Sequence, residues 1–216
     1  RFSSYAFFDR SRCSLSIYYS RFANFLNTPI MILNEECTSI KRQTIYDHFN
    51  TKCINASSCT FLNVHTNSSG GAIYIKWSES TYSFIDQCTF IFCTARSEGG
   101  AIYFGIYPVQ FGILSATSSI FSSCQIENEY DFNDVSGGAI YCHCEIINVS
   151  NSTFKNCGII SNVGNCRGGA IYANVCNATQ AFYLTVFFYC FVFTNTFTIT
   201  NTNTNWITNS FFYSFK

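Results

Sequence analysis

The pentapeptide Gly-Gly-Ala-Ile-Tyr occurs four times in this chain of 216 residues, at positions 70–74, 99–103, 137–141 and 168–172. Recurrence at such intervals is typical of proteins that stack copies of one supersecondary unit. Each copy is then buried mainly by its neighbours, so the repeat limits the fold more than any single residue does. We therefore predict one elongated repeat domain.

A second series of residues runs in phase with the pentapeptide. A Phe recurs every 29 to 33 residues, and three positions after it stands a Val in the first unit and a Cys in the next four. If units stack, every Phe packs on the Phe above and below, which explains the repeat by burial. This predicted structural ladder consists of Phe61, Phe90, Phe121, Phe154, Phe187, Cys93, Cys124, Cys157 and Cys190.

The pentapeptide segments alternate with a period of two, which is typical of β-strands. Ile73 and Ile75 share one face, and Tyr74 lies on the other. The paired glycines allow a corner with positive φ before each strand. Strands that recur in the same order stack in parallel rather than as hairpins. We predict an all-β, right-handed parallel β-helix solenoid of about five rungs, the hand following the rule for parallel crossovers.

The repeat also predicts the organisation of the chain. Residues 50–193 form the β-helix repeat domain, 1–49 are degenerate N-terminal rungs or a cap, and 194–216 are an incomplete C-terminal strand segment. Two units carry extra residues between the Phe and the next glycine pair, at 125–136 and 158–167. We expect these insertions to be corner loops that project side by side from one edge, outside the stacked core.

Two stretches carry a resemblance to a known family. Residues 152–157 read Ser-Thr-Phe-Lys-Asn-Cys and residues 167–172 read Arg-Gly-Gly-Ala-Ile-Tyr. This combination resembles the polymorphic outer membrane protein repeats, and their Cys-rich variants in protist surface proteins, over residues 52–190. The resemblance implies a pectin-lyase-like right-handed β-helix on surface-exposed or secreted proteins linked to adhesion. The chain departs from the family in placing Cys or Val where the family has the Asn of Phe-x-x-Asn.

The thirteen cysteines are an odd number, so they cannot all pair within one chain. Stacking places the repeated cysteines about 4.8 Å apart, a Cα separation that a disulfide tolerates. Parallel side chains that face the same way rarely reach the disulfide dihedral angle, so we favour a ladder of buried thiols over bridges between rungs.

Charge and composition limit the partners. The chain has 12 basic and 12 acidic residues and no basic stripe, so we expect no nucleic-acid partner. We expect a host-cell protein or a glycan, and membrane association only through segments outside this chain. Five Asn-x-Ser/Thr sequons favour an extracellular or cell-surface location. These candidate glycosylation sites are Asn55, Asn67, Asn148, Asn151 and Asn177.

Enzymes on β-helix folds need clustered carboxylates or an acid–base pair. Asp86 is the one acid on a well-matched strand, and the equivalent positions in the next units hold Thr117, Ser150 and Tyr183. We therefore predict a protein without enzymatic activity, with no catalytic or cofactor-binding residue.

Two segments invite a metal-binding interpretation. The acidic run Glu127, Glu129, Asp131 and Asp134 fits no EF-hand spacing and is typical of a solvated loop. The segment Cys142-His143-Cys144 lacks the second ligand pair of a zinc site, and its cysteines continue the inward face of the strand. We expect neither segment to bind a metal.

The tyrosine of each pentapeptide lies on the face opposite the core-forming isoleucine. A row of rings on an exposed sheet could dock a sugar or a protein, or the rings could only stack on each other. This candidate ligand surface consists of Tyr74, Tyr103, Tyr141 and Tyr172. We predict a non-enzymatic, cell-surface or secreted protein for adhesion or interaction. The alternatives are a carbohydrate-active β-helix enzyme, or a non-functional fragment of a repeat-protein family.

Overall fold

The structure is a computed structural model. It describes residues 7–9, 15–33, 52–77, 81–106, 112–128, 134–144, 146–161, 166–175, 180–183 and 185–194. Within these residues every regular element is a β-strand, and every strand pair is parallel. The expected strand segment at 194–216 lies, apart from Thr194, outside the described residues.

The strands form three large sheets and one small sheet. Sheet A contains β1 (Phe7–Asp9), β4 (Ile30–Leu33), β7 (Ile73–Trp77), β10 (Ile102–Ile106), β15 (Ile140–Cys144) and β20 (Ile171–Val175). Sheet B contains β2 (Leu15–Tyr18), β5 (Lys52–Ser57), β8 (Thr81–Asp86), β11 (Gly112–Thr117), β16 (Ile146–Ser150) and β21 (Gln180–Tyr183).

Sheet C contains β3 (Arg21–Ala23), β6 (Thr60–His65), β9 (Thr89–Ala95), β12 (Ile120–Ser122), β13 (Gln125–Asn128), β17 (Thr153–Lys155), β18 (Gly158–Ser161), β22 (Val186–Phe188) and β23 (Phe191–Thr194). The small sheet pairs β14 (Val135–Ser136) with β19 (Cys166–Arg167).

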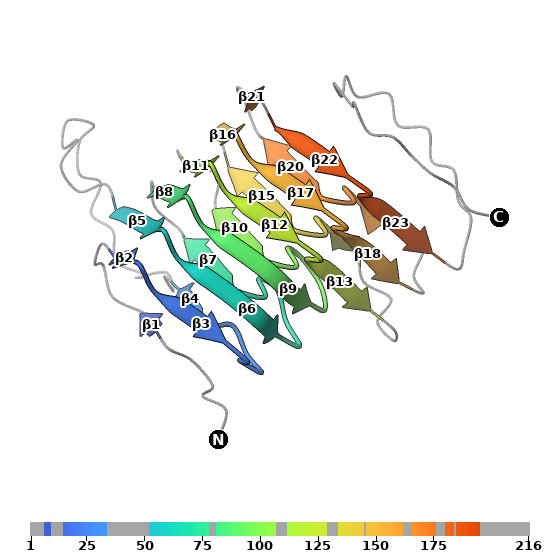
Figure 1. Ribbon diagram of the computed structural model, residues 1–216, viewed down its shortest axis with the longest axis horizontal. Helices are drawn as coiled ribbons and strands as arrows, with labels where there is room; N and C mark the ends of the chain where they lie inside the picture. The colour runs from blue at the N-terminus through green and yellow to red at the C-terminus, as the bar shows by residue number, and fades with distance from the viewer. Residues whose placement is uncertain are drawn as a thin grey trace, which may run out of the picture.

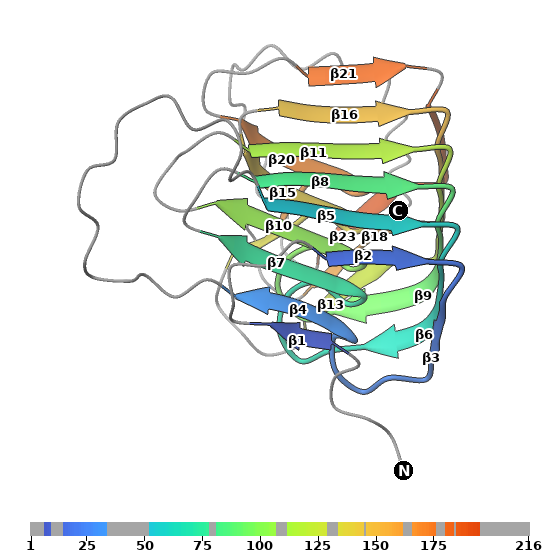
Figure 2. The same ribbon diagram turned by 90° about the vertical axis from the view of Figure 1, so that its left-hand side faces the viewer.

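Each turn of the chain passes through sheet B, then sheet C, then sheet A. Figure 1 looks onto sheet C, whose strands lie side by side along the molecule. In Figure 2 the strands of sheet B form a single layer from β2 to β21. The chain is therefore a parallel β-solenoid, with about three turns in its most regular part. The predicted three strands per unit and their parallel stacking are confirmed.

The register of the sheets keeps the repeat in phase. Ile102 pairs with Ile73 on one side and with Ile140 on the other. In sheet C, Phe90 pairs with Phe61 and Phe121. The rings of Phe90 and Phe121 stack with centroids 4.7 Å apart and an interplanar angle of 3°. The predicted inward Phe stack is thus present, and its inner rings are fully buried.

Corners between the sheets use left-handed backbone. In the turn from β8 to β10 these corners are Gln87 (φ 52°) and Gly99 (φ 61°), and Phe92 (φ 51°) makes a further bend inside β9 of sheet C. The paired glycines were expected to serve this purpose, and the first of each pair, with its positive φ, does so. The second glycine has a different one, because a Cβ on Gly100 would lie 2.1 Å from the carbonyl oxygen of Gly138 in the next turn. Gly100 therefore permits close stacking of neighbouring corners.

The first described turn extends the ladder beyond the expected five rings. The ring of Phe22, on β3, stacks on Phe61 at 4.9 Å. The strands β2, β3 and β4 pair with β5, β6 and β7, so part of the segment expected as degenerate rungs or a cap continues all three sheets.

The expectation that the insertions at 125–136 and 158–167 are loops outside the core is wrong. They lie side by side as predicted, since β13 pairs with β18 and β14 pairs with β19. They are not core-free loops, however. Ile126, Val135 and Ile159 are fully buried and form a second, smaller core. Apolar side chains at alternate positions of these short strands have a neighbouring rung to pack against, which a projecting loop would lack.

Candidate functional site

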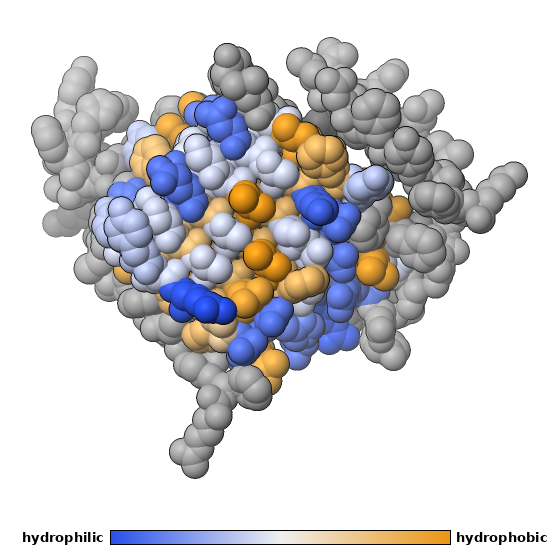
Figure 3. All heavy atoms as spheres, in the orientation of Figure 1, coloured by the Kyte–Doolittle hydropathy of each residue, from blue (hydrophilic) through white to orange (hydrophobic). Residues whose placement is uncertain are grey.

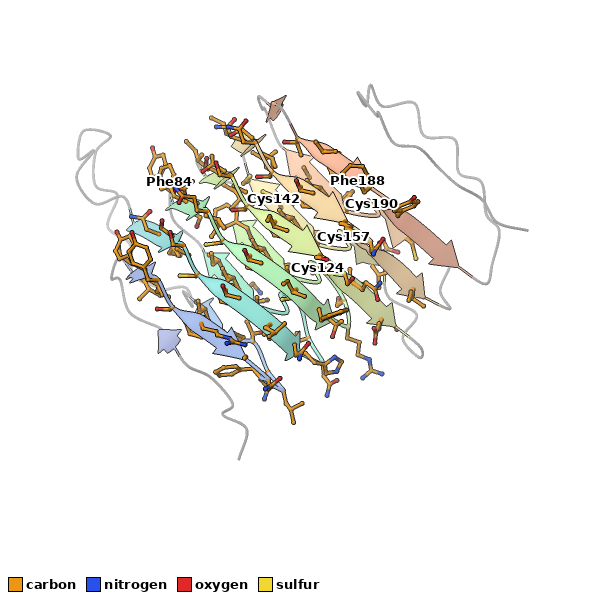
Figure 4. The ribbon with its side chains drawn as sticks, in the orientation of Figure 1. Phe84, Cys124, Cys142, Cys157, Phe188 and Cys190 are labelled. Atoms are coloured by element: carbon orange, nitrogen blue, oxygen red, sulfur yellow. The ribbon has the colours of Figure 1, made fainter. Side chains whose placement is uncertain are left out.

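The cysteines of the structural ladder lie inside the solenoid beside the Phe stack. The Sγ of Cys124 lies 3.5 Å from the carbonyl oxygen of Phe90 in the preceding turn, and Cys157 repeats this contact with Phe121 at 3.5 Å. In Figure 4 the labelled Cys124, Cys157 and Cys190 follow one another along sheet C. All nine cysteines whose side chains are described carry free thiols. The thiols of Cys93, Cys124, Cys157 and Cys190 all lie within hydrogen-bonding distance of a Phe carbonyl in the preceding turn, so this ladder links the turns along the core.

A second ladder of small polar side chains lines the corner between sheets B and C. Cys88 Sγ lies 3.3 Å from the carbonyl oxygens of Ala56 in the preceding turn and of Asp86 in its own. Ser152 Oγ donates to the carbonyl of Ser150 at 2.9 Å and lies 3.4 Å from that of Ala116 in the preceding turn. Burial raises the pKa of the Cys88 thiol to about 12. A neutral donor is what this position requires, and both Cys and Ser supply it.

The segment Cys142-His143-Cys144 lies on β15 with both cysteines inside the solenoid. Their sulfurs are 2.7 Å apart, and burial raises the pKa of Cys142. His143 lies on the opposite side of the strand, since side chains alternate along it, and burial lowers its pKa. No group of three potential metal ligands occurs among the described residues.

The acidic run around β13 is only partly described. Glu127 and Asp134 are exposed, while Glu129 and Asp131 lie outside the described residues. Asp134 forms an ion pair with Arg167, with an N–O distance of 3.5 Å. This pair connects the two insertions across the small sheet, where Val135 pairs with Cys166.

Asp86 lies at the end of β8, on the outer side of sheet B. Thr117 donates its hydroxyl to Asp86 Oδ1 at 2.5 Å, and Gln87 donates its amide to Oδ2 at 3.1 Å. Its register partners are Ser57 and Thr117. Both carboxylate oxygens are therefore engaged by neutral donors of the same corner.

The tyrosines form a stacked row on the outer side of sheet A. Tyr74 and Tyr103 have ring centroids 4.6 Å apart, and Tyr103 and Tyr141 have centroids 5.0 Å apart. Tyr141 and Tyr172 are tilted by 32°. The two central side chains are only 7% and 8% exposed, whereas Tyr74 and Tyr172 are partly exposed.

Charged groups lie at both ends of this row. Arg167 donates to the hydroxyl of Tyr172 at 3.3 Å, and its guanidinium lies 6.0 Å from the ring centroid. At the other end, Glu98 accepts a hydrogen bond from Ser69 at 3.4 Å. Burial raises the pKa of Tyr74, and the nearby Glu98 carboxylate raises it further. The accessible part of the row is thus its ends, where polar groups adjoin the rings.

The sequons occupy two kinds of position. Asn55 and Asn148 lie on outward positions of β5 and β16 in sheet B and are partly exposed. Asn67 and Asn151 are exposed at corners, and Asn151 has a φ of 49°. Asn177 lies outside the described residues.

Several exposed apolar side chains escaped the sequence analysis. On sheet C, besides Phe92 and the ladder residue Phe187, they are Ile120, Ile160, Val186 and Phe188, and we call these four the sheet C patch. Figure 3 shows apolar side chains interspersed with polar ones across this side of the molecule. Phe84 on β8 and Tyr18 on β2 are exposed on sheet B. The repeat gave no consistent signal for them, because polar residues such as Thr153 and Lys155 hold the same positions in a neighbouring turn.

Within the described residues no helix is long and apolar enough to cross a membrane. Comparison with known families, curated proteins and solved structures yields no match.

Proposed function

We propose that this protein is a non-enzymatic, cell-surface or secreted repeat protein that acts in adhesion or interaction. The observation that carries the proposal is the difference between the core side chains and those exposed on sheet C. The buried side chains are used for stacking between turns, while sheet C presents the exposed apolar side chains of its patch. Exposed apolar side chains gathered on one face of a protein are typical of interaction surfaces. The partner we propose is a host-cell protein or a glycan.

We also propose the finer details of the fold. The solenoid is right-handed, since parallel crossovers almost always are, and it extends to about five rungs of pectin-lyase-like type. The Gly-Gly-Ala-Ile-Tyr and Phe-x-x-Cys elements support a relationship to the Cys-rich variants of polymorphic outer membrane protein repeats. Their spacing along the chain matches the strands that stack in sheets A and C.

A cell-binding assay tests the function and locates the contact surface. Two double variants are compared with the unaltered protein: Ile120→Lys with Ile160→Lys on sheet C, and Tyr74→Ala with Tyr172→Ala at the partly exposed ends of the tyrosine row on sheet A. We expect the sheet C variant to lose binding at least tenfold, because each charge replaces an exposed apolar contact. Folding is checked by circular dichroism. Unchanged binding by both folded variants would remove both surfaces as contact sites.

A substrate screen tests the absence of catalysis. Both oxygens of Asp86 accept hydrogen bonds from the neutral donors Thr117 and Gln87. Its register partners in the described turns are Ser57 and Thr117 rather than a second carboxylate of the kind that glycan cleavage requires. We expect no turnover of pectin, glycosaminoglycan or mucin. Turnover that disappears in Asp86→Asn would instead establish the carbohydrate-active alternative.

A further inference from the structure

The outer surface of sheet B carries one sequon in an aromatic setting. Asn55 and Ser57, the two recognition residues of the sequon, both point outward from β5, and Ala56 between them is buried in the core. Strand geometry explains this, since alternate side chains share a face. The acceptor amide therefore lies on the flat outer surface of the folded solenoid.

Two exposed aromatic rings flank this asparagine. In the next turn, Phe84 is the register partner of Asn55 and is 44% exposed. In the preceding turn, Tyr18 is the partner of Ser57 and is 54% exposed. Figure 4 shows Phe84 on the outside of β8, away from the core cysteines. Directly paired strand residues on one face are within side-chain contact of each other.

The asparagine of the other strand sequon has no aromatic register partner. Asn148 pairs with Ser115 of the preceding turn and Ala181 of the next, while its sequon serine, Ser150, pairs with Thr117 and Tyr183. The same sheet thus offers two asparagines on equivalent outward positions, one paired directly with an exposed aromatic residue and one paired with small residues on both sides.

We propose that Asn55 carries an N-linked glycan whose first sugar packs against the ring of Phe84, with Tyr18 on the other side. The C–H face of a pyranose is apolar and matches the flat face of an aromatic ring, so the sugar covers a ring that otherwise faces water. In the transfer step, Asn55 Nδ2 bonds to C1 of a lipid-linked oligosaccharide and loses one proton, and the lipid pyrophosphate leaves. This inference rests on the proposed surface or secreted location.

Glycopeptide mass spectrometry of protein from its native cell tests occupancy. We expect a hexosamine-linked peptide that contains Asn55. Glycans on other sequons with Asn55 empty would overturn this inference and leave the proposed location intact. A chain without any glycan that is retained inside the cell would overturn both.

A double-mutant cycle tests the contact itself. The full chain is secreted from a eukaryotic host with an added signal peptide, and its glycans are trimmed enzymatically to the first sugar. The sugar at Asn55 is removed with Asn55→Gln, in the presence of Phe84 or of Phe84→Ser, the residue that stands at position 115 in the next turn. We expect the sugar to raise the melting temperature by about 2 °C with Phe84 and by less than half of that with Phe84→Ser.

Two matched controls separate contact from general effects. Asn148→Gln removes a sequon whose asparagine pairs with small residues, and Phe92→Ser removes an exposed aromatic residue from sheet C, where Ser123 holds the corresponding bend. We expect neither change to couple to Phe84 or to the Asn55 sugar. An effect of the Asn55 sugar that is equal with and without Phe84 would overturn the packing contact, whatever the native location proves to be.

Discussion

A side chain in this solenoid is stabilised mainly by the same position in the turns above and below. Phe121 illustrates this, because its ring lies between Phe90 at 4.7 Å and Phe154 at 4.6 Å, nearly parallel to both. The thiol of Cys157 reaches back to the Phe121 carbonyl. The energy of one residue therefore depends on the number of turns that cover it.

Replacing an inner ring should cost more than replacing the last ring of the ladder. Phe121→Ala creates a cavity between two rings and should lower the free energy of unfolding by about 3–5 kcal/mol. Phe187 stacks on Phe154 at 5.0 Å but remains 39% exposed, so Phe187→Ala should cost less than half as much. Urea unfolding of both variants measures the difference. Equal losses would contradict the proposed dependence on neighbouring turns.

At the scale of the element, corners set how closely strands stack. The backbone amide of Gln87 donates to the carbonyl of Thr117, and that of Ser118 donates to Ser150, so each left-handed corner is bonded to the next. Asn, Ser, Gln and Tyr all occupy such corners. The glycine pairs tolerate substitution less well. The first glycine has a positive φ, and a Cβ on the second would collide with the backbone of the next turn.

The second glycine of a pair should tolerate no side chain. A Cβ on Gly100 would lie 2.1 Å from the oxygen of Gly138 and 2.5 Å from that of Gln125, both in the backbone. Gly100→Ala should therefore cost about 3 kcal/mol through overpacking. Gly105→Ala is the comparison, since its Cβ would meet the side chain of Tyr103 rather than backbone atoms of the next turn. Similar melting temperatures for the two variants would show that the corners can separate without loss.

The paired insertions should contribute to stability. Ile126 is fully buried and packs with Val135 and Ile159 in the second core, so Ile126→Ala should cost about 2–5 kcal/mol. The neighbouring Glu127 is exposed, and Glu127→Ala should change little. Deleting residues 127–134 should likewise lower the melting temperature, because it removes the segment that brings Val135 against Ile126. An unchanged melting temperature after deletion would restore the view of a core-free loop.

Across the whole molecule, repetition decided what the sequence could predict. Strand order, parallel stacking, the Phe stack and the inward cysteines follow from residues that recur in phase. Phe22 was missed because its unit lacks the glycine pair and lies 39 residues before Phe61. Features that occur in one turn only, such as Phe84 beside Asn55, carry no periodic signal. The burial of Tyr103 and Tyr141 could not be predicted either. An alternating pattern shows which face of a strand a side chain lies on, but not whether other residues bury that face.

Because buried thiols run along the core, the whole solenoid should lose stability at alkaline pH. Burial raises the pKa of Cys88 to about 12 and that of Cys124 and Cys157 well above the ordinary value of 9.0. Above pH 9 the unfolded chain releases these protons while the folded chain retains them. Stability is therefore fully present below pH 9 and falls as pH rises, by up to about 1.4 kcal/mol per pH unit for each thiol.

Urea unfolding between pH 7.5 and pH 10.5 measures this loss. Val64 stands at the position equivalent to Cys124 in an earlier turn, so the turn accommodates Val there. Cys124→Val should make the decline of stability with pH less steep by the contribution of one thiol. Burial also raises the pKa of Tyr74, so its ionisation lowers stability at the upper end of this range, but this effect is common to both proteins and cancels in the comparison. A decline that is identical with and without the Cys124 thiol would show that the ladder is not the alkaline-sensitive part of the solenoid.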